Sequence, residues 1–272
     1  MSCNARTARD SAVEALMRRA CDEAILPHYH SLSYADVANK APDDVVTVAD
    51  HASERLLTEG LHAIEPGVPV VGEEAAEADS GVLDALAGDC WIVDPLDGTN
   101  NFAAGKPPFG ILVARASGGI AQSGYILDCL TGRFCHAHLG GGAMLDGEPV
   151  RARPSGAEPP IAAISLIFLD RAEREAVKRH IAPHYTLVDI PRCAAEQYPR
   201  LALGQNDVSL FERTLAWDHA APALWLNEAG GKVARPDGSA YRVDEPTRTG
   251  LIGAASSALW DELATRIEAM EA

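Results

Sequence analysis

A chain of 272 residues, of which 47% are hydrophobic and 23% charged, has the composition of a soluble globular protein with a substantial core. The formal net charge of -16 argues against binding nucleic acid through its phosphate backbone, which needs a basic surface. Six scattered cysteines without a Cys-x-x-Cys pair favour reduced thiols, and the sequence has neither a membrane-length apolar run nor a signal-peptide core at its start. We therefore expect a cytoplasmic protein that does not act at a membrane.

The first hundred residues alternate between helical and strand patterns. Residues 8–25 carry an apolar stripe with the 3.6-residue period of an amphipathic helix, and a second helix is expected after Asp50. Short apolar runs at 68–71 and 90–93 read as strands. The first of these strands leads into Gly72-Glu73-Glu74, and the second leads into Asp94.

Between 109 and 151 the pattern indicates an antiparallel meander. The expected strands are separated by turns that contain glycine, and Asp146-Gly147 is a strong hairpin signal. These strands are Phe109–Ser117, Ile120–Asp128 and Arg133–His138.

From residue 160 onward, strands and helices alternate. We expect strands at Ile161–Leu169, Tyr185–Ile190, Val208–Phe211 and Leu251–Ala255, and helices at 171–181, 193–203, about 219–229 and the C-terminus. The whole pattern predicts a layered α/β (α+β) protein in two halves, 1–155 and 156–272, that form one compact unit.

The segment Trp91–Phe102 is the most informative part of the chain. An apolar run delivers Asp94 and Asp97, three residues apart, into a turn shaped by proline and glycine. Neighbouring carboxylates repel and resist burial, and a divalent cation such as Mg²⁺ resolves the conflict because it prefers hard oxygen ligands. The alternative is a solvated turn in which Asp97 or Thr99 caps a helix.

Other acidic residues also fall where strands end or helices begin. Glu73 and Glu74 follow a strand and a glycine, and Asp50 precedes a helix. Asp218 is expected just before a helix, because Pro222 fits only a first helical turn. Each alone is usually a loop residue or a cap, but together they predict one site at the ends of the strands.

In these acidic segments the chain resembles the inositol monophosphatase family, within the lithium-sensitive, magnesium-dependent phosphatases. The signature W-x-x-D-P-[IL]-D-G-T-x-N-F matches residues 91–102 throughout. Gly-Glu-Glu at 72–74, Asp-x-Val-Thr-x-x-Asp at 44–50, Trp-Asp-x-Ala-Ala at 217–221 and Glu-Ala-Gly-Gly at 228–231 match in the family's order. The resemblance covers nearly the whole chain and implies a five-layered αβαβα sandwich that forms a homodimer.

The resemblance also implies a set of site residues. The first metal ion would be held by Glu73, Asp94 and the backbone carbonyl of Leu96, and the second by Asp94, Asp97 and Asp218. Glu73 would also touch a weaker third ion, and Glu74 would support the metal site.

Catalysis, on the same resemblance, is hydrolysis of a phosphate monoester with Mg²⁺ and inhibition by Li⁺. Thr99, with Asp50 behind it and Glu73 beside it, would orient the attacking water. Gly98 and Thr99 amides would receive the phosphate next to Asp97, and a helix beginning at this point would favour the anion.

The substrate is open at the sequence level. Arg192 and Glu212 are possible substrate contacts, but Phe211 stands where the family commonly has an acid. The family's Gly-Ser-Ala stretch is replaced here by residues 192–196, Arg-Cys-Ala-Ala-Glu. Inositol monophosphate is the first candidate; histidinol phosphate, 3'-phosphoadenosine 5'-phosphate, fructose 1,6-bisphosphate and other sugar phosphates are alternatives.

Two rival functions remain. His28-x-His30 and His136-x-His138 raise the possibility of a histidine-metal hydrolase, because residues i and i+2 of a strand share a face, although no third ligand is placed by pattern. A non-catalytic sensor of phosphorylated metabolites would use the same fold, but all the acidic residues for catalysis are present.

Overall fold

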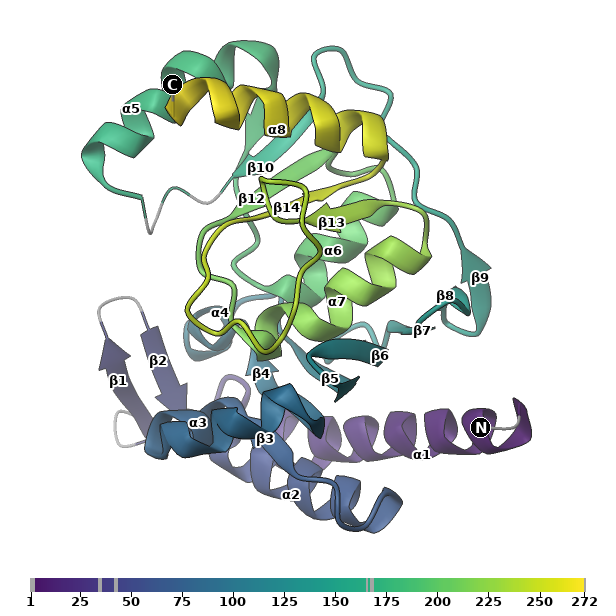
Figure 1. The fold of residues 1–272 in the computed structure, drawn as a ribbon. Helices are drawn as coiled ribbons and strands as arrows, with labels where there is room; N and C mark the ends of the chain where they lie inside the picture. Colours follow the sequence, from purple (N-terminus) through teal and green to yellow (C-terminus); the bar gives the residue numbers. More distant parts are fainter. Residues whose placement is uncertain (1–2, 34–35, 42–43, 165, 167–168, 272) are drawn as a thin grey trace.

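The computed structural model describes residues 3–33, 36–41, 44–164, 166 and 169–271. Its elements form five layers, and Figure 1 shows them from bottom to top as helices, sheet, helices, sheet and helices. This arrangement confirms the expected layered αβαβα architecture. No helix in the described part of the chain is long and apolar enough to cross a membrane.

The lower helical layer and the larger sheet come from the first 150 residues. The helices are α1 (Cys3–Ala20) and α2 (Val48–Ile64), with the π-helical turn η1 (Cys21–Ile25) after α1. The seven-stranded sheet has the order β3 (Val70–Gly72), β4 (Asp89–Asp97), β5 (Gly110–Ser117), β6 (Ile120–Asp128), β7 (Phe134–His138), β8 (Gly142–Leu145) and β9 (Glu148–Val150). β3 is parallel to β4, and the later strands form the expected antiparallel meander.

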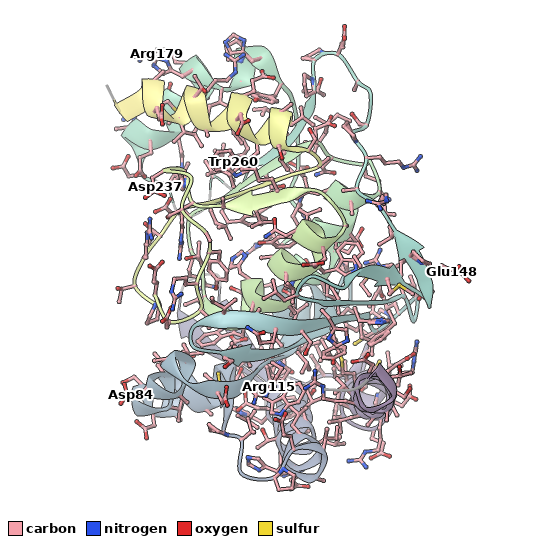
Figure 2. The ribbon with its side chains drawn as sticks, turned by 45° about the vertical axis from the view of Figure 1, so that its right-hand side comes forward. Asp84, Arg115, Glu148, Arg179, Asp237 and Trp260 are labelled. Atoms are coloured by element: carbon pink, nitrogen blue, oxygen red, sulfur yellow. The ribbon has the colours of Figure 1, made fainter. Side chains whose placement is uncertain are left out.

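The smaller sheet and the two upper helical layers follow. The five strands lie in the order β11 (Thr186–Val188), β10 (Ile161–Ile164), β12 (Val208–Phe211), β14 (Leu251–Ala254) and β13 (Lys232–Ala234). Helices α6 (Ala194–Ala202) and α7 (Ala216–Glu228) lie between the sheets, and α5 (Arg171–His180) and α8 (Ser257–Glu271) cover the outer face. Figure 2 shows the side chains that fill these layers; Trp260 of α8 donates from its indole nitrogen to the carbonyl of Ile252 in β14, at 3.2 Å.

Alternation along the central strands decides which side chains meet which helical layer. In β4, Trp91 and Val93 pack toward α1 and α2, whereas Cys90 and Ile92 pack with the first turns of α7. Successive strand residues point to opposite faces, so the even-numbered positions of β4 belong to the α7 side. The same alternation bears on the direction of the acidic side chains at the end of β4.

Several boundaries differ from the sequence-based expectations. The strand expected at Ile161–Leu169 ends at Ile164 within the described residues, and the one expected at Tyr185–Ile190 spans Thr186–Val188. The Asp146-Gly147 hairpin is confirmed, with both residues at positive φ between β8 and β9.

Three small elements of the N-terminal half were not expected. They are the antiparallel hairpin of β1 (Val37–Ala41) and β2 (Asp44–Thr47), and the short helices α3 (Glu73–Ala78) and η4 (Ser80–Ala87). The division at residue 155 stays a prediction.

The predicted start of α7 after Asp218 is wrong. The helix begins at Ala216, so Asp218 lies in its first turn and Pro222 lies inside the helix. Proline inside a helix has no N–H for the carbonyl four residues earlier, which here is the carbonyl of Asp218. Tertiary packing of α7, most of whose residues are buried, offsets this loss.

Close packing of α7 on the sheet depends on Gly124 in β6. A Cβ at this position would lie 2.7 Å from the carbonyl oxygen of Ala221 and 2.8 Å from its Cα. We predict that Gly124→Ala lowers the free energy of unfolding by about 1–3 kcal/mol, because the backbone of α7 would have to move away from the sheet. Urea unfolding measures this, with Gly88→Ala, where the nearest atom is 3.7 Å away, as control; equal stability of the two variants would contradict the packing argument.

Candidate active site

The carboxylate of Asp94 points toward α7 because of its position in β4. It continues the even-numbered series Cys90 and Ile92, whose side chains pack on that face. Asp94 is 1% exposed, and one of its oxygens, Oδ1, accepts the amide of Leu96 at 3.0 Å.

Asp97 would point to the other face if β4 were regular, because it lies an odd number of residues after Asp94. The pairing with β5 shifts at this point: Asp94 pairs with Leu112, and Asp97 pairs with Gly110. Three steps along β4 therefore match two along β5, and a bulge of this kind returns the side chain to the first face. Pro95 sits in the bulge, where no amide is needed for the ladder.

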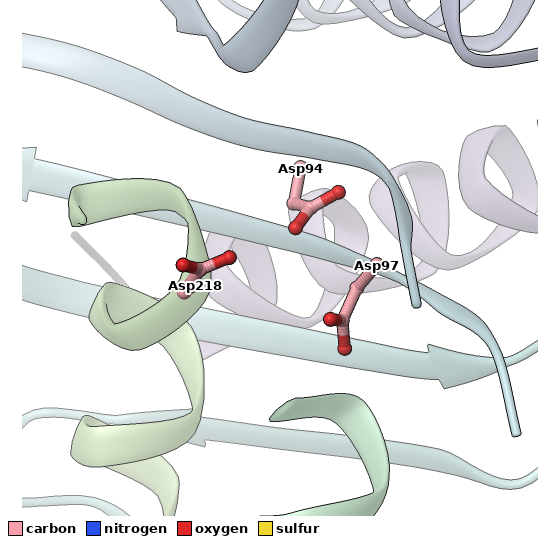
Figure 3. Close-up of side chains that lie close together, drawn as sticks. All are labelled: Asp94, Asp97 and Asp218. Carbon is pink, nitrogen blue, oxygen red and sulfur yellow. The ribbon is translucent and has the colours of Figure 1, made fainter. Parts of the chain in front are cut away.

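Asp218 completes the acidic group from the first turn of α7. One oxygen from each of Asp94, Asp97 and Asp218 lies within 4.8 Å of the other two, and Figure 3 shows the three carboxylates converging from β4 and α7. Asp94 and Asp97 are buried and Asp218 is half-buried. The structure thus brings together the three residues that the family resemblance assigns to the second metal ion, and their role as its ligands stays a prediction.

Electrostatics make this group unfavourable without a cation. Burial raises the pKa of Asp94 well above its usual value, and the nearby carboxylates of Glu73, Asp97 and Asp218 raise it further. Burial also raises the pKa of Asp97, although hydrogen bonds from the amide of Ala195 and the thiol of Cys193 oppose the shift. Clustered, buried carboxylate oxygens fit a hard divalent cation, which would favour their ionised forms.

Asp97 is held by a contact that the sequence analysis did not anticipate. Its Oδ2 accepts the amide of Ala195 at 2.6 Å and the thiol of Cys193 at 3.1 Å. Both donors lie at the start of α6, a hundred residues away in sequence, so no local signal identifies them.

Thr99 and Asp50 meet as predicted for residues that orient a water. Thr99 Oγ1 lies 3.0 Å from Asp50 Oδ1 and 2.8 Å from the carbonyl oxygen of Leu96. Because the hydroxyl has one proton, it donates to one of these two oxygens at a time. Asp50 also forms a capping box with Thr47 at the start of α2, so its capping and site roles coexist. Burial raises the Asp50 pKa to about 6, and the charge of Glu74 adds to the shift.

The turn after Asp97 requires a glycine at position 98. Gly98 has a φ of 86°, and a Cβ there would lie 2.9 Å from the carbonyl oxygen of Pro108. Helix α4 (Thr99–Ala103) starts at this turn but has only five residues, so its dipole is small. The assignment of the Gly98 and Thr99 amides to phosphate stays a prediction.

Glu73 and Glu74 open helix α3, at the end of β3. Glu73 is close enough to Asp94 to raise the pKa of that carboxyl, although it is not part of the 4.8 Å group. Glu74 is buried, and His51 Nδ1 lies 4.0 Å from its Oε2. The roles assigned to both residues stay predictions.

The two suggested substrate contacts lie outside the acidic group. Arg192 is exposed, adopts a positive φ of 54° and precedes the Cys193 that holds Asp97. Glu212 follows β12, while the ring of Phe211 stacks on buried Tyr198 with a centroid distance of 5.2 Å. Phe211 is therefore a half-buried residue that packs against the core, in the position where the resembled family carries its acid.

One histidine of the β7 pair, His138, has a structural partner in α1. His138 Nε2 lies 2.9 Å from Asp10 Oδ2, and Tyr125 donates to the other oxygen of Asp10 at 2.7 Å. In the described part of the chain, only the group of Asp94, Asp97 and Asp218 places three possible ligand atoms within metal-binding range. The cysteines at 21, 90, 129, 135 and 193 are free and buried.

Comparison with known proteins decides between the remaining interpretations. The family model described as the inositol monophosphatase family matches residues 7–271. The chain belongs to the inositol monophosphatase family. Members of this family are metal-dependent phosphatases, so the chain is a phosphoric monoester hydrolase.

Individual relatives agree with the family match. Inositol-1-monophosphatase SuhB of Mycobacterium tuberculosis is 31% identical over 210 residues, covering 72% of this chain and 70% of the relative. A histidinol-phosphatase of Chlorobaculum parvum is 30% identical over 199 residues, covering 72% and 74%. The fold matches the crystal structure of the extragenic suppressor protein suhB of Bartonella henselae, with a TM-score of 0.81 and 24% identity over 96% of this chain and 98% of that one.

The raised pKa values predict how pH affects the metal-free protein. An acid whose pKa is higher in the folded state binds protons more tightly there, so its contribution to stability is lost as pH rises above the unfolded value of 3.8. In EDTA, Asp94→Asn should therefore have a higher Tm than wild type near pH 8, with a difference that shrinks as pH falls toward about 4. Thermal unfolding across this range measures it; a difference independent of pH would contradict the electrostatic argument.

Proposed function

We propose that this enzyme hydrolyses a small phosphorylated polyol with Mg²⁺ as its cofactor, with inositol monophosphate as the first candidate substrate. The observation that carries the proposal is the convergence of Asp94, Asp97 and Asp218 within 4.8 Å of one another. Thr99 follows β4 closely in the chain, and its hydroxyl lies 3.0 Å from a carboxylate oxygen of Asp50 in α2. Together they provide a cation site and a group that can orient water.

The ligand roles that we propose are those that the family resemblance implies. Glu73, Asp94 and the Leu96 carbonyl would hold one Mg²⁺, Asp94, Asp97 and Asp218 would hold a second, and Glu73 would touch a weaker third. When bound, these ions supply charge neutralisation and a more acidic water for in-line displacement at phosphorus.

The remaining residues position the water and the phosphate. Thr99, held by Asp50, would accept a hydrogen bond from the attacking water and, together with Glu73, orient it. Gly98 and Thr99 amides would bind phosphate oxygens, and Glu74 would maintain the charge around the first ion. Positioning and charge neutralisation account for most catalysis of phosphoryl transfer, so no cysteine or histidine nucleophile is needed.

The leaving group is the least defined part of the proposal. The curated relatives include both an inositol-1-monophosphatase and a histidinol-phosphatase at similar identity. Histidinol phosphate is therefore the second candidate, with 3'-phosphoadenosine 5'-phosphate and fructose 1,6-bisphosphate behind it. We assign contacts with the leaving group to Arg192 and Glu212. Li⁺ sensitivity, a homodimer and a cytoplasmic location belong to the same proposal.

Phosphate release across these four substrates tests the proposal. We expect turnover of one substrate far above the others, dependent on Mg²⁺, abolished by EDTA and inhibited by Li⁺ in competition with Mg²⁺. Asp94→Asn should abolish turnover while leaving the far-UV circular dichroism unchanged. Full activity of this variant, or undiminished activity in EDTA, would overturn the metal-site assignment.

The water-orienting role predicts the effect of changing Thr99. Thr99→Ala should lower kcat by about 100-fold or more, the range of general acid–base contributions, with little change in Mg²⁺ affinity. Thr99→Ser keeps the hydroxyl between Asp50 and the Leu96 carbonyl and should retain most activity. Equal losses in both variants would show that the methyl group, rather than the hydroxyl, matters.

Substrate contact predicts a different kinetic signature for Glu212. Glu212→Gln should raise KM by about tenfold with kcat little changed, because a hydrogen bond from a substrate hydroxyl to a charged group is weakened in ground and transition states alike. Glu148→Gln, on exposed β9, is the matched control. An unchanged KM for Glu212→Gln would remove this residue from the substrate site.

A further inference from the structure

Helix α3 has no side-chain cap of its own, and Glu54 of α2 supplies one. The N-cap position of α3 is Gly72, which has no side chain to accept the free amides of the first turn. Glu54 Oε2 accepts the amide of Glu74 at 2.8 Å, and Glu54 Oε1 accepts the amide of Ala75 at 2.9 Å. Both oxygens of one carboxylate are thus bound to the backbone directly after Glu73.

Gly72 is shaped to admit this carboxylate. A Cβ at Gly72 would lie 2.4 Å from both Cδ and Oε2 of Glu54. Gly72 is buried and has a φ of -98°, which any residue can adopt, so space rather than backbone conformation requires glycine here. The glycine of the Gly-Glu-Glu motif and Glu54 therefore form one contact.

The contact matters because the two glutamates in the first turn of α3 lie near other carboxylates, which repel them. Glu73 lies close enough to Asp94, and Glu74 close enough to Asp50, to raise the pKa of those carboxyls. Repulsion within this group favours moving α3 away, and α3 is only six residues long. Two hydrogen bonds from a charged acceptor to consecutive amides resist that movement.

Glu54 also connects two parts of the site through one helix. Asp50 and Glu54 lie one turn apart on α2. The same helix therefore carries the carboxylate that contacts Thr99 and the carboxylate that caps α3 beside Glu73. Ser53, between them, donates to the carbonyl of Pro95 in the β4 bulge at 2.8 Å. One face of α2 therefore sets the relative positions of α3, the bulge and Thr99.

We propose that Glu54 is a positioning residue that fixes the first turn of α3 and so holds Glu73 at the metal site. The inference rests on the proposed function, because it assumes that Glu73 is a metal ligand. It assigns no direct contact between Glu54 and a metal ion or substrate.

Mn²⁺ binding to the full-length protein, followed by electron paramagnetic resonance, tests the proposal without relying on turnover. Glu54→Gln should raise the dissociation constant by about 10- to 100-fold, the usual cost of losing a partner that orients a ligand. Glu59→Gln removes the same charge from an exposed position of α2 and should bind Mn²⁺ like wild type. Activity of Glu54→Gln should recover as Mg²⁺ is raised, because the ligand itself is still present.

Two further variants separate the possible failures. Gly72→Ala displaces the Glu54 carboxylate without altering it and should weaken Mn²⁺ binding in the same direction, which keeps the test valid if Glu54→Gln unfolds. Glu73→Gln tests the underlying assignment: if it binds Mn²⁺ like wild type, the proposed function has the wrong ligand set. If Glu73→Gln loses affinity but Glu54→Gln and Gly72→Ala, both folded, do not, the positioning role is wrong.

Discussion

Three carboxylates held within 4.8 Å of one another inside a folded protein repel each other and lose most of their hydration. The folded state tolerates such a group by protonating it or by binding a cation. The raised pKa values of Asp94 and Asp97 correspond to protonation. Carboxylate oxygens, which are hard donors, are suited to binding a cation. Much of the surrounding structure can be understood as the means of holding this group together.

Strand β4 and helix α7 supply the three carboxylates, and the position of each carboxylate has a different structural cause. The alternation of side chains along β4 directs Asp94 toward α7, and the bulge turns Asp97 to the same face. The packing of α7 against the sheet places Asp218. The amide of Ala195 then fixes one oxygen of Asp97 from α6. The site consequently depends on the seven-stranded sheet and on both helices of the middle layer.

The sequence predicted those parts of the site that are encoded locally. The spacing of Asp94, Asp97 and Thr99 in one segment indicates a cation and phosphate turn, and the hydrophobic periods around it indicate a layered α/β fold. Pro222 misled the placement of α7, because burial of the helix outweighs the missing amide hydrogen bond. Cys193 and Glu54 could not be found from spacing, since each reaches its partner only through tertiary packing.

Diffraction from crystals of this enzyme soaked in Mn²⁺, measured at a wavelength where manganese scatters anomalously, tests the central claim most directly. The account predicts an anomalous peak within bonding distance of Asp94, Asp97 and Asp218, and loss of that peak in Asp94→Asn. Manganese bound elsewhere on a surface carrying a net charge of -16, with no peak among these three carboxylates, would contradict it.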